Sequence, residues 1–351
     1  MKRFCSFWLV LLNFVSLAQE KSPLTLNGYI EVYYGKDFAN PTQNTRPSFL
    51  YNHTRVNEVA PNLALLKASY SQVQVRANLA LMAGTYAQYN LAAEPELLRA
   101  IYEANVGIKL SRQRDLWLDA GVFSSHIGFE SAIGKDCWTL TRSLAAENSP
   151  YYESGVKLSY LSPNGKWLLA GFVLNGWQRI KRVDGNTSLN IGTQIQYKPS
   201  ATITLNSSTF LGNDKPDLDQ RNRYFHDFYE QFQLSQQTGA MVGFDIGWEQ
   251  QAKGSNAYSH WITPVVIVQQ KLSPNWSLSG RWEYYQDTKG VIVSTNTPNG
   301  FQTVGYSINV DFSPFDKVLC RLEAKQYQSK DAIFDGKSTN TALTTSLALS
   351  F

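Results

Sequence analysis

The stretch Leu24–Tyr34 reads LTLNGYIEVYY and decides the fold class, because its side chains alternate in character at every residue. One face reads Leu24, Leu26, Gly28, Ile30, Val32 and Tyr34. The opposite face carries polar groups such as Asn27 and Glu31. Such alternation is typical of a β-strand with one apolar face and one wet face.

The same alternation recurs to the end of the chain, and no helical periodicity competes with it over a long stretch. Clear examples are residues 73–81, 104–110, 116–122, 304–312, 318–324 and 343–351. We count about sixteen such segments. No 40-to-45-residue repeat with a blade motif is present, which disfavours a β-propeller.

The connections between these segments alternate in length. Short turns fall near residues 71, 112–115, 162–165, 198–200, 236–238, 273–275 and 313–316. Longer polar links cover residues 35–48, 85–96, 124–150, 179–188, 213–221, 251–257, 287–300 and 329–339. This asymmetry predicts an all-β, transmembrane, antiparallel up-and-down β-barrel of about sixteen strands, with tight periplasmic turns and long outer loops.

Two sets of side chains indicate that the apolar face meets lipid and the polar face lines a wet lumen. The predicted lumen set is charged and comprises Glu31, Arg76, Glu103, Lys109, Asp119, Glu153, Lys157, Arg281, Glu283, Arg321, Glu323 and Lys325. The aromatic residues predicted for the two interfacial girdles are Tyr33, Tyr34, Tyr51, Tyr151, Tyr152, Trp177, Tyr197, Trp276 and Tyr284.

The two ends of the chain point to the same compartment. Lys2 and Arg3 precede an apolar run at residues 4–17 that ends in Ser16-Leu17-Ala18, so we predict a signal peptide at 1–18 and one barrel domain at 19–351. The last strand ends on Phe351 and resembles the signal that the outer-membrane barrel assembly machinery reads. We therefore expect export to the outer membrane of a Gram-negative bacterium.

Composition excludes several classes of protein. The 351 residues are 43% hydrophobic and 17% charged, which argues against disordered and collagen-like chains. A formal net charge of +4 gives no reason to expect a nucleic-acid partner. Cys137 and Cys320 have no CxxC or histidine neighbour, so we expect both to be unpaired and predict no metal site and no cofactor.

Several stretches resemble the OmpL-like β-barrel porin family, which is typical of Bacteroidota outer membranes. They are residues 51–59 (YNHTRVNEV), 76–111, 116–160 and 171–180 (GFVLNGWQRI). From residue 190 onward the likeness lies in architecture more than in motif. The resemblance implies a pore-forming outer-membrane protein, and it implies neither a substrate nor catalytic residues.

The longest link, residues 124–150, is the first candidate functional element. It contains His126, Glu130 and Arg142. Folded inward, it would narrow the channel and set selectivity through its lining residues; folded outward, it would be a surface lid with solvated charges. The sequence leaves both readings open.

Charges on the predicted lumen face are the second candidate. The cations Arg55, Arg76, Arg281 and Arg321 have Glu31, Glu58, Glu103, Glu283 and Glu323 as counter-charges. Separated rows of opposite charge would orient solutes in the narrow part, whereas paired charges would only brace the wall. Pairing is favoured where Arg281 adjoins Glu283 and where Glu323 lies between Arg321 and Lys325.

An enzyme inside the barrel would need a nucleophile beside a base. The chain has no GxSxG, HExxH or SxxK pattern, so we predict that it is not an enzyme. A cluster of Ser125, His126 and Glu130 would count against this prediction.

The sequence thus predicts a porin that lets small hydrophilic solutes or ions diffuse passively. A closed barrel of about sixteen strands is too wide to be filled by its own wall side chains. The alternative is a barrel whose long loops bind a surface ligand or partner, with transport incidental. A homotrimer, by analogy with general porins, stays open.

Overall fold

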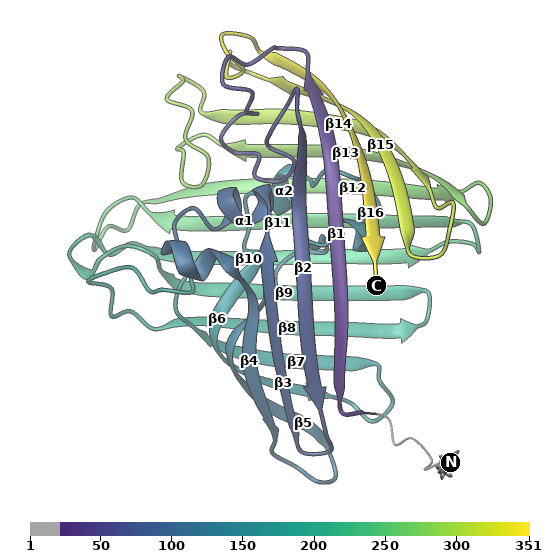
Figure 1. Cartoon of the computed structure of the whole chain (residues 1–351). Coiled ribbons are helices and arrows are strands. Elements are labelled where there is room, and N and C mark those ends of the chain that lie inside the picture. Colours follow the sequence, from purple (N-terminus) through teal and green to yellow (C-terminus); the bar gives the residue numbers. More distant parts are fainter. Residues whose placement is uncertain (1–21) are drawn as a thin grey trace, which may run out of the picture.

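The computed structural model describes residues 22–351, so the predicted signal peptide lies outside the described residues. The chain forms one closed barrel of 16 antiparallel strands in which each strand pairs with its sequence neighbours (Figure 1). β1 closes the barrel on β16, with Tyr29 opposite Ser350 and Asp37 opposite Ala342. This confirms the predicted fold class.

The strands have the following bounds: β1 Leu24–Asp37, β2 Val59–Ser71, β3 Val75–Ala83, β4 Ile101–Lys109, β5 Asp115–Ser124, β6 Tyr152–Leu161, β7 Trp167–Leu174, β8 Asn190–Ser200, β9 Ile203–Asn213, β10 Asn222–Gln233, β11 Thr238–Gln250, β12 Tyr258–Lys271, β13 Trp276–Asp287, β14 Phe301–Phe312, β15 Val318–Ser329 and β16 Thr339–Ser350. Short helices interrupt three long connections: α1 Thr85–Asn90, η1 Glu96–Ala100, η2 Gly134–Asp136, α2 Leu144–Glu147 and η3 Asp217–Asp219. Within the described residues, none of these helices has the length and apolar character needed to cross a membrane.

The two strand faces are assigned as the alternation predicts. The apolar side chains of Leu26 and Ile308 point outward and are 66% and 63% exposed. Glu31 and Glu323, on the opposite face, are fully buried inside the barrel. Apolar exposure of this kind is stable only against lipid, because soluble proteins rarely expose a continuous apolar surface.

Seven short and eight long connections alternate around the two rims, as predicted. The first long link differs in extent: it was expected at 35–48 but runs from 38 to 58. β1 continues to Asp37 and pairs there with β16, while the chain after residue 48 turns inward and forms only an isolated bridge between Thr45 and Arg55.

The girdle prediction was wrong for several aromatic residues. Tyr34 and Trp276 are 40% and 44% exposed on the outside, but Tyr33, Tyr151 and Tyr152 are buried inside the barrel. Tyr33 shares a strand face with Glu31, so its position in the alternation sends it inward. Tyr151 is the last residue of the long β5–β6 connection, which itself lies inside, and Tyr152 follows it as the first residue of β6.

The barrel seam explains a glycine on the outward face. Gly28 exchanges backbone hydrogen bonds of 2.8 and 3.0 Å with Phe351. The Phe351 ring lies directly over Gly28, where a Cβ atom would overlap it. Gly28 therefore serves the closure of β1 on the end of the chain.

Candidate constriction in the channel lumen

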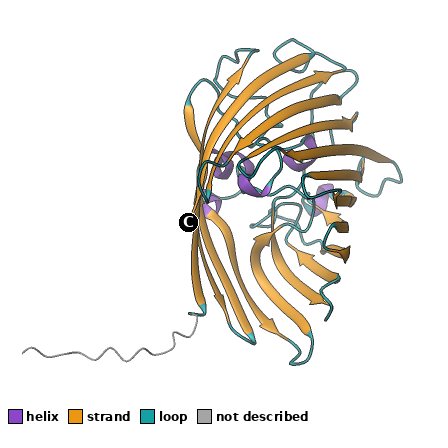
Figure 2. Ribbon diagram, turned by 90° about the vertical axis from the view of Figure 1, so that its right-hand side faces the viewer, coloured by secondary structure: helices purple, strands orange, loops and turns teal. Residues whose placement is uncertain are grey.

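The β5–β6 loop, residues 125–151, lies inside the barrel. Figure 2 shows loop and helix segments occupying the middle of the barrel. Every residue from 139 to 151 is buried, which an outer surface lid would not show. The backbone N–H of Ser125 still bonds the carbonyl of Tyr151 at 3.0 Å, so both ends of the loop start from one place on the wall. Of the two readings that the sequence left open, the structure has the inward one.

Cations of the inner wall hold this loop by its backbone. Arg281 of β13 donates to the carbonyl of Thr141 at 2.7 Å. Arg321 of β15 donates to the carbonyls of Gly134 at 2.8 Å and Cys137 at 2.9 Å. Lys325 donates to the carbonyl of residue 142 at 2.8 Å. Three wall cations thus satisfy carbonyls that an irregular buried loop would otherwise leave unpaired.

Carboxylates between these cations complete the attachment. Glu323 accepts a hydrogen bond from the backbone N–H of Thr141, and Glu283 accepts one from Leu144. The same two carboxylates form ion pairs with Arg281, at 2.9 Å from Glu323 and 3.5 Å from Glu283. The charges therefore form a paired network on β13–β15 and do not form separated rows.

Gly305 of β14 makes room for this network. It lies opposite Glu283 on one side and Tyr327 on the other. A Cβ atom at Gly305 would come within 2.6 Å of a Glu283 carboxylate oxygen. Without a side chain at 305, Glu283 lies across β14 and reaches Lys325 of β15 at 2.9 Å.

Arg142 and Glu130 fix the loop to itself. Arg142 is fully buried and donates to the carbonyls of Ser131, Ala132 and Leu140 at 2.7, 3.2 and 2.6 Å. Glu130 accepts from the backbone N–H of Ser143 at 2.9 Å and lies 3.7 Å from Arg281. In this arrangement, the guanidinium of Arg142 faces backbone oxygens of the loop.

The loop also supports the β1–β2 loop above it. The Glu147 carboxylate accepts backbone hydrogen bonds from Tyr51 at 2.8 Å and Asn52 at 3.1 Å. Burial raises the pKa of Glu147, and these hydrogen bonds oppose that shift. Nearby, His53 lies 2.8 Å from Glu31, which also accepts from Asn62. Glu31 is thus part of a buried contact between β1 and two further segments.

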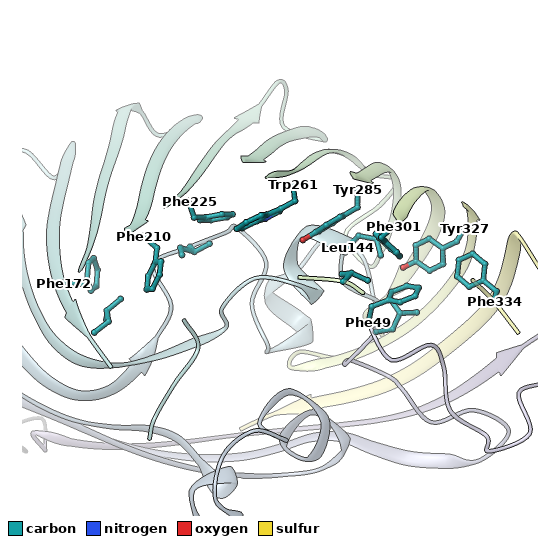
Figure 3. Packing of buried hydrophobic residues seen from close by; sticks show 14 of the residues in the cluster. Phe49, Leu144, Phe172, Phe210, Phe225, Trp261, Tyr285, Phe301, Tyr327 and Phe334 are labelled. Atoms are coloured by element: carbon teal, nitrogen blue, oxygen red, sulfur yellow. The ribbon is translucent and has the colours of Figure 1, made fainter. Parts of the chain in front are cut away.

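An aromatic belt runs along the inner wall from β7 to β15 and continues into the β15–β16 loop (Figure 3). Its members are Phe172, Phe210, Phe225, Trp261, Tyr285, Phe301, Tyr327 and Phe334. Phe49 of the β1–β2 loop packs edge-on against Phe301, with ring centroids 4.8 Å apart. Leu144 of the β5–β6 loop belongs to the same cluster. Apolar packing therefore adds to the polar network in holding both loops.

The wall formed by β2–β6 keeps its cations in contact with water. The side chains of Lys67, Arg76, Lys109 and Lys157 are 30%, 31%, 22% and 27% exposed. Arg76 forms a bidentate pair with Asp119, at 2.6 and 2.5 Å, and Lys67 pairs with Glu103. At the outer mouth, Arg55 pairs with Glu58 at 2.6 Å. Of the wall arginines expected to line the pore, Arg76 therefore meets water, whereas Arg281 and Arg321 contact the loop.

His126 lies at the start of the loop, and both of its ring nitrogens face hydrogen-bond acceptors. Its Nδ1 lies 2.8 Å from a Glu153 oxygen, and its Nε2 lies 2.9 Å from the carbonyl oxygen of Thr209. A carbonyl and a carboxylate are both acceptors, so this arrangement favours the imidazolium, in which both ring nitrogens donate. Burial alone lowers the pKa of His126, but Glu153 and the Thr209 carbonyl outweigh it and raise the pKa above its usual value.

The state of His126 predicts a pH effect on the loop. The attachment is complete below the usual histidine pKa and is lost as the pH rises through the raised value of the folded protein. The current noise of the open channel is expected to increase from mildly acidic to alkaline pH. His126→Gln should abolish this dependence, and His260→Gln, on the outward face of β12, should retain it. Noise that does not change with pH in the unmodified protein would contradict the assignment.

Ser125, His126 and Glu130, whose clustering would have suggested an enzyme, each bond to other groups. His126 bonds Glu153, the Ser125 hydroxyl accepts from the backbone of Ile127 at 3.1 Å, and Glu130 bonds Ser143. Across residues 22–351, no group of three or more His, Cys, Asp or Glu side chains is placed to hold a metal ion. An inward loop held by wall charges, beside a wall with water-exposed cations, is the arrangement of a constricted lumen.

Sequence reasoning missed three kinds of inner residue. The belt aromatics Phe225 and Trp261 were not singled out, although alternation along β10 and β12 puts both on the inner face. Arg46 was missed because it lies in a long loop, where alternation says nothing about side-chain direction. Asn309, which accepts from the backbone of Leu140 at 3.1 Å, follows the same strand pattern as its charged neighbours.

Solved structures share the barrel fold at low sequence identity. An anion-selective porin from Comamonas acidovorans superposes with a TM-score of 0.61 at 9% identity, covering 93% of this chain and 99% of that chain. The outer membrane channel DcaP of Acinetobacter baumannii gives 0.61 at 12% identity, covering 93% and 97%. A loop L8 deletion mutant of OmpT from Vibrio cholerae gives 0.60 at 8%, covering 93% and 99%.

Family membership rests on sequence. No curated protein matches the chain. The model of the family described as "Putative beta-barrel porin-2, OmpL-like" matches residues 23–351, which is the whole described barrel. The chain therefore belongs to the OmpL-like beta-barrel porin-2 family and is an outer-membrane porin.

Proposed function

We propose that this porin lets small hydrophilic solutes and ions diffuse passively, along the part of the lumen that borders β2–β6. The observation that carries the proposal is that the β5–β6 loop covers the charged side chains of one part of the inner wall and leaves those of another part exposed to water. The β5–β6 loop covers the charges of β13–β15, whereas Lys67, Arg76, Lys109 and Lys157 remain in contact with water. The loop then sets the width of the path, and the β2–β6 charges meet the solute.

The proposal includes a modest preference for anions. On the wet wall, four cations that are 22–31% exposed face three acids. Of these acids, Asp115 is 44% exposed, whereas Glu103 and Asp119 are only 12% and 4% exposed. A lumen lined by more accessible cations than anions raises the local concentration of anions. The +4 net charge of the chain does not produce this preference, which depends on the local surface.

Single-channel recording tests this function. The detergent-purified barrel, checked for heat-modifiable migration, is inserted into a planar lipid bilayer, and the reversal potential is taken under a salt gradient. Stepwise openings with a reversal potential on the anion side are expected. Arg76→Gln should shift the reversal potential toward cations, while Arg55→Gln, at the outer mouth, should shift it less. A folded barrel without current would contradict the proposal.

The remaining partner assignments belong to the same proposal. Signal-directed export through residues 1–18 and recognition of Phe351 by the barrel assembly machinery account for delivery to the outer membrane of a Gram-negative bacterium. Assembly as a homotrimer is supported by OmpT of Vibrio cholerae, for which a trimer form is solved. The mass of the detergent-solubilised complex, measured by light scattering, decides between monomer and trimer.

A further inference from the structure

Arg46, in the β1–β2 loop, is a buried cation without a counter-charge. It is 6% exposed, and its hydrogen-bonded partner is the Thr344 hydroxyl of β16. Its Nε is buried and has no partner. None of the ion pairs among residues 22–351 includes Arg46. A buried charge of this kind is costly unless something compensates it.

The acidic side chains nearby are bonded to groups other than Arg46. The Asp37 carboxylate accepts from the side-chain amide of Asn340 at 2.9 and 3.0 Å and from the backbone of Ala39 at 2.8 Å. Glu58 is paired with Arg55. The wall charges Glu283 and Glu323 belong to the network that holds the β5–β6 loop. Arg46 therefore differs from the buried wall cations Arg223, Arg281, Arg321 and Lys325, each of which has a carboxylate partner.

Arg46 lines a cavity of about 1000 Å³ at the outer mouth. The cavity lies between the β1–β2, β3–β4, β13–β14 and β15–β16 loops. Hydroxyl groups and aromatic rings make up much of its wall, including Thr45, Thr54, Thr295, Tyr51 and Tyr89. The acid on this wall, Asp335, is exposed at the tip of its loop. The site thus combines the buried guanidinium of Arg46 with neutral donors and acceptors, and its other charged residues are Asp335 and Arg55, which is paired with Glu58.

We propose that this cavity binds the carboxylate or phosphate group of a small anionic solute, with Arg46 as the charged ligand. A guanidinium offers several N–H donors in one plane and pairs with such groups in a bidentate manner. The bound anion would supply the missing counter-charge, and the surrounding hydroxyls would bond the rest of the solute. The inference deepens the proposed function, on which it rests, because it places a solute-binding step before passage along the cationic β2–β6 wall.

Equilibrium binding tests the site independently of current. The detergent-folded full chain is titrated with succinate and, separately, with inorganic phosphate by calorimetry. Arg46→Gln is expected to weaken binding of the preferred anion by about tenfold or more, the loss typical of a charge-assisted hydrogen bond. Arg55→Gln is the matched control: it removes the same charge from the same cavity wall, but Arg55 is already paired with Glu58. It should change binding by less than about twofold.

Arg46→Lys keeps the charge if Arg46→Gln does not fold, which heat-modifiable migration reports. It should still bind several-fold more weakly, because a lysine offers one compact donor group. The inference is overturned if neither anion binds the unmodified protein at millimolar concentration, or if the Arg46 variants bind as well as the Arg55 control. Conductance without binding would sink the inference and leave the proposed function standing. Binding without conductance would support the anion site and contradict the proposed channel function.

Discussion

Replacing residues 130–148 by a short glycine-serine linker is expected to raise the single-channel conductance several-fold. The excision is feasible because the ends of the β5–β6 loop meet at the hydrogen bond between Ser125 and Tyr151. Conductance grows with the open cross-section, and this loop crosses the lumen. The barrel itself closes through strand pairing in which the loop takes no part.

The control for this excision is a loop outside the lumen. Shortening the β11–β12 connection, residues 251–257, removes a mostly exposed segment and should leave the conductance unchanged. Ion selectivity should change little after the excision, since the uncovered cations Arg281, Arg321 and Lys325 are balanced by Glu283, Glu323 and Asp311. If the excised barrel conducts like the unmodified one, the loop does not limit flow.

Arg281→Gln is expected to lower the free energy of unfolding by about 3–5 kcal/mol, the typical cost of breaking a buried ion pair from one side. Arg281 is fully buried between Glu283 and Glu323, so the variant leaves both carboxylates short of a partner. It also removes the donors to Thr139 and Thr141 of the loop, at 2.7 and 3.0 Å. Denaturant titration of the barrel in detergent or vesicles measures the loss.

Arg76→Gln serves as the comparison for Arg281→Gln. Arg76 is also paired with a carboxylate, but its side chain is 31% exposed, so its removal should cost about 0–1 kcal/mol. The double variant Arg281→Gln with Glu323→Gln should recover part of the loss, because it no longer leaves Glu323 charged and unpaired. Equal losses at Arg281 and Arg76 would show that the network on β13–β15 is not what stabilises the loop.

Strand number, face assignment and the alternation of short and long connections could all be predicted from the sequence. Each depends on a local rule: the two-residue period puts Arg281 and Glu283 on one face, and turn residues mark the rims. The same rule, applied to Tyr33, would have placed it inside with Glu31. Its assignment to a girdle failed because a position near a strand end was weighed above the alternation.

The position of the β5–β6 loop could not be predicted, because it depends on partners far away in the sequence. Thr141 meets Arg281 and Glu323 across 140 and 182 residues. No local sequence pattern in residues 125–151 predicts those contacts. Arg142 shows the same limit: its charge suggested a pore-lining role, whereas its guanidinium contacts carbonyls of its own loop. A paired network at these positions was foreseen, but the partners of Glu323 were not. Glu323 pairs across strands with Arg281, while its strand neighbours Arg321 and Lys325 pair with Asp311 and Glu283.

The wall cations bind the β5–β6 loop largely through its peptide carbonyls. The path of the loop across the lumen therefore does not depend on the identity of its exposed side chains. Side chains such as Lys135 and Asp136, which are exposed on the loop, can be exchanged without touching the bonds from Arg321 and Lys325. The loop can therefore diverge, or be engineered, at its water-facing positions while its path across the lumen is retained. The same barrel wall can thus hold loops with different exposed side chains, and with them different channel selectivities.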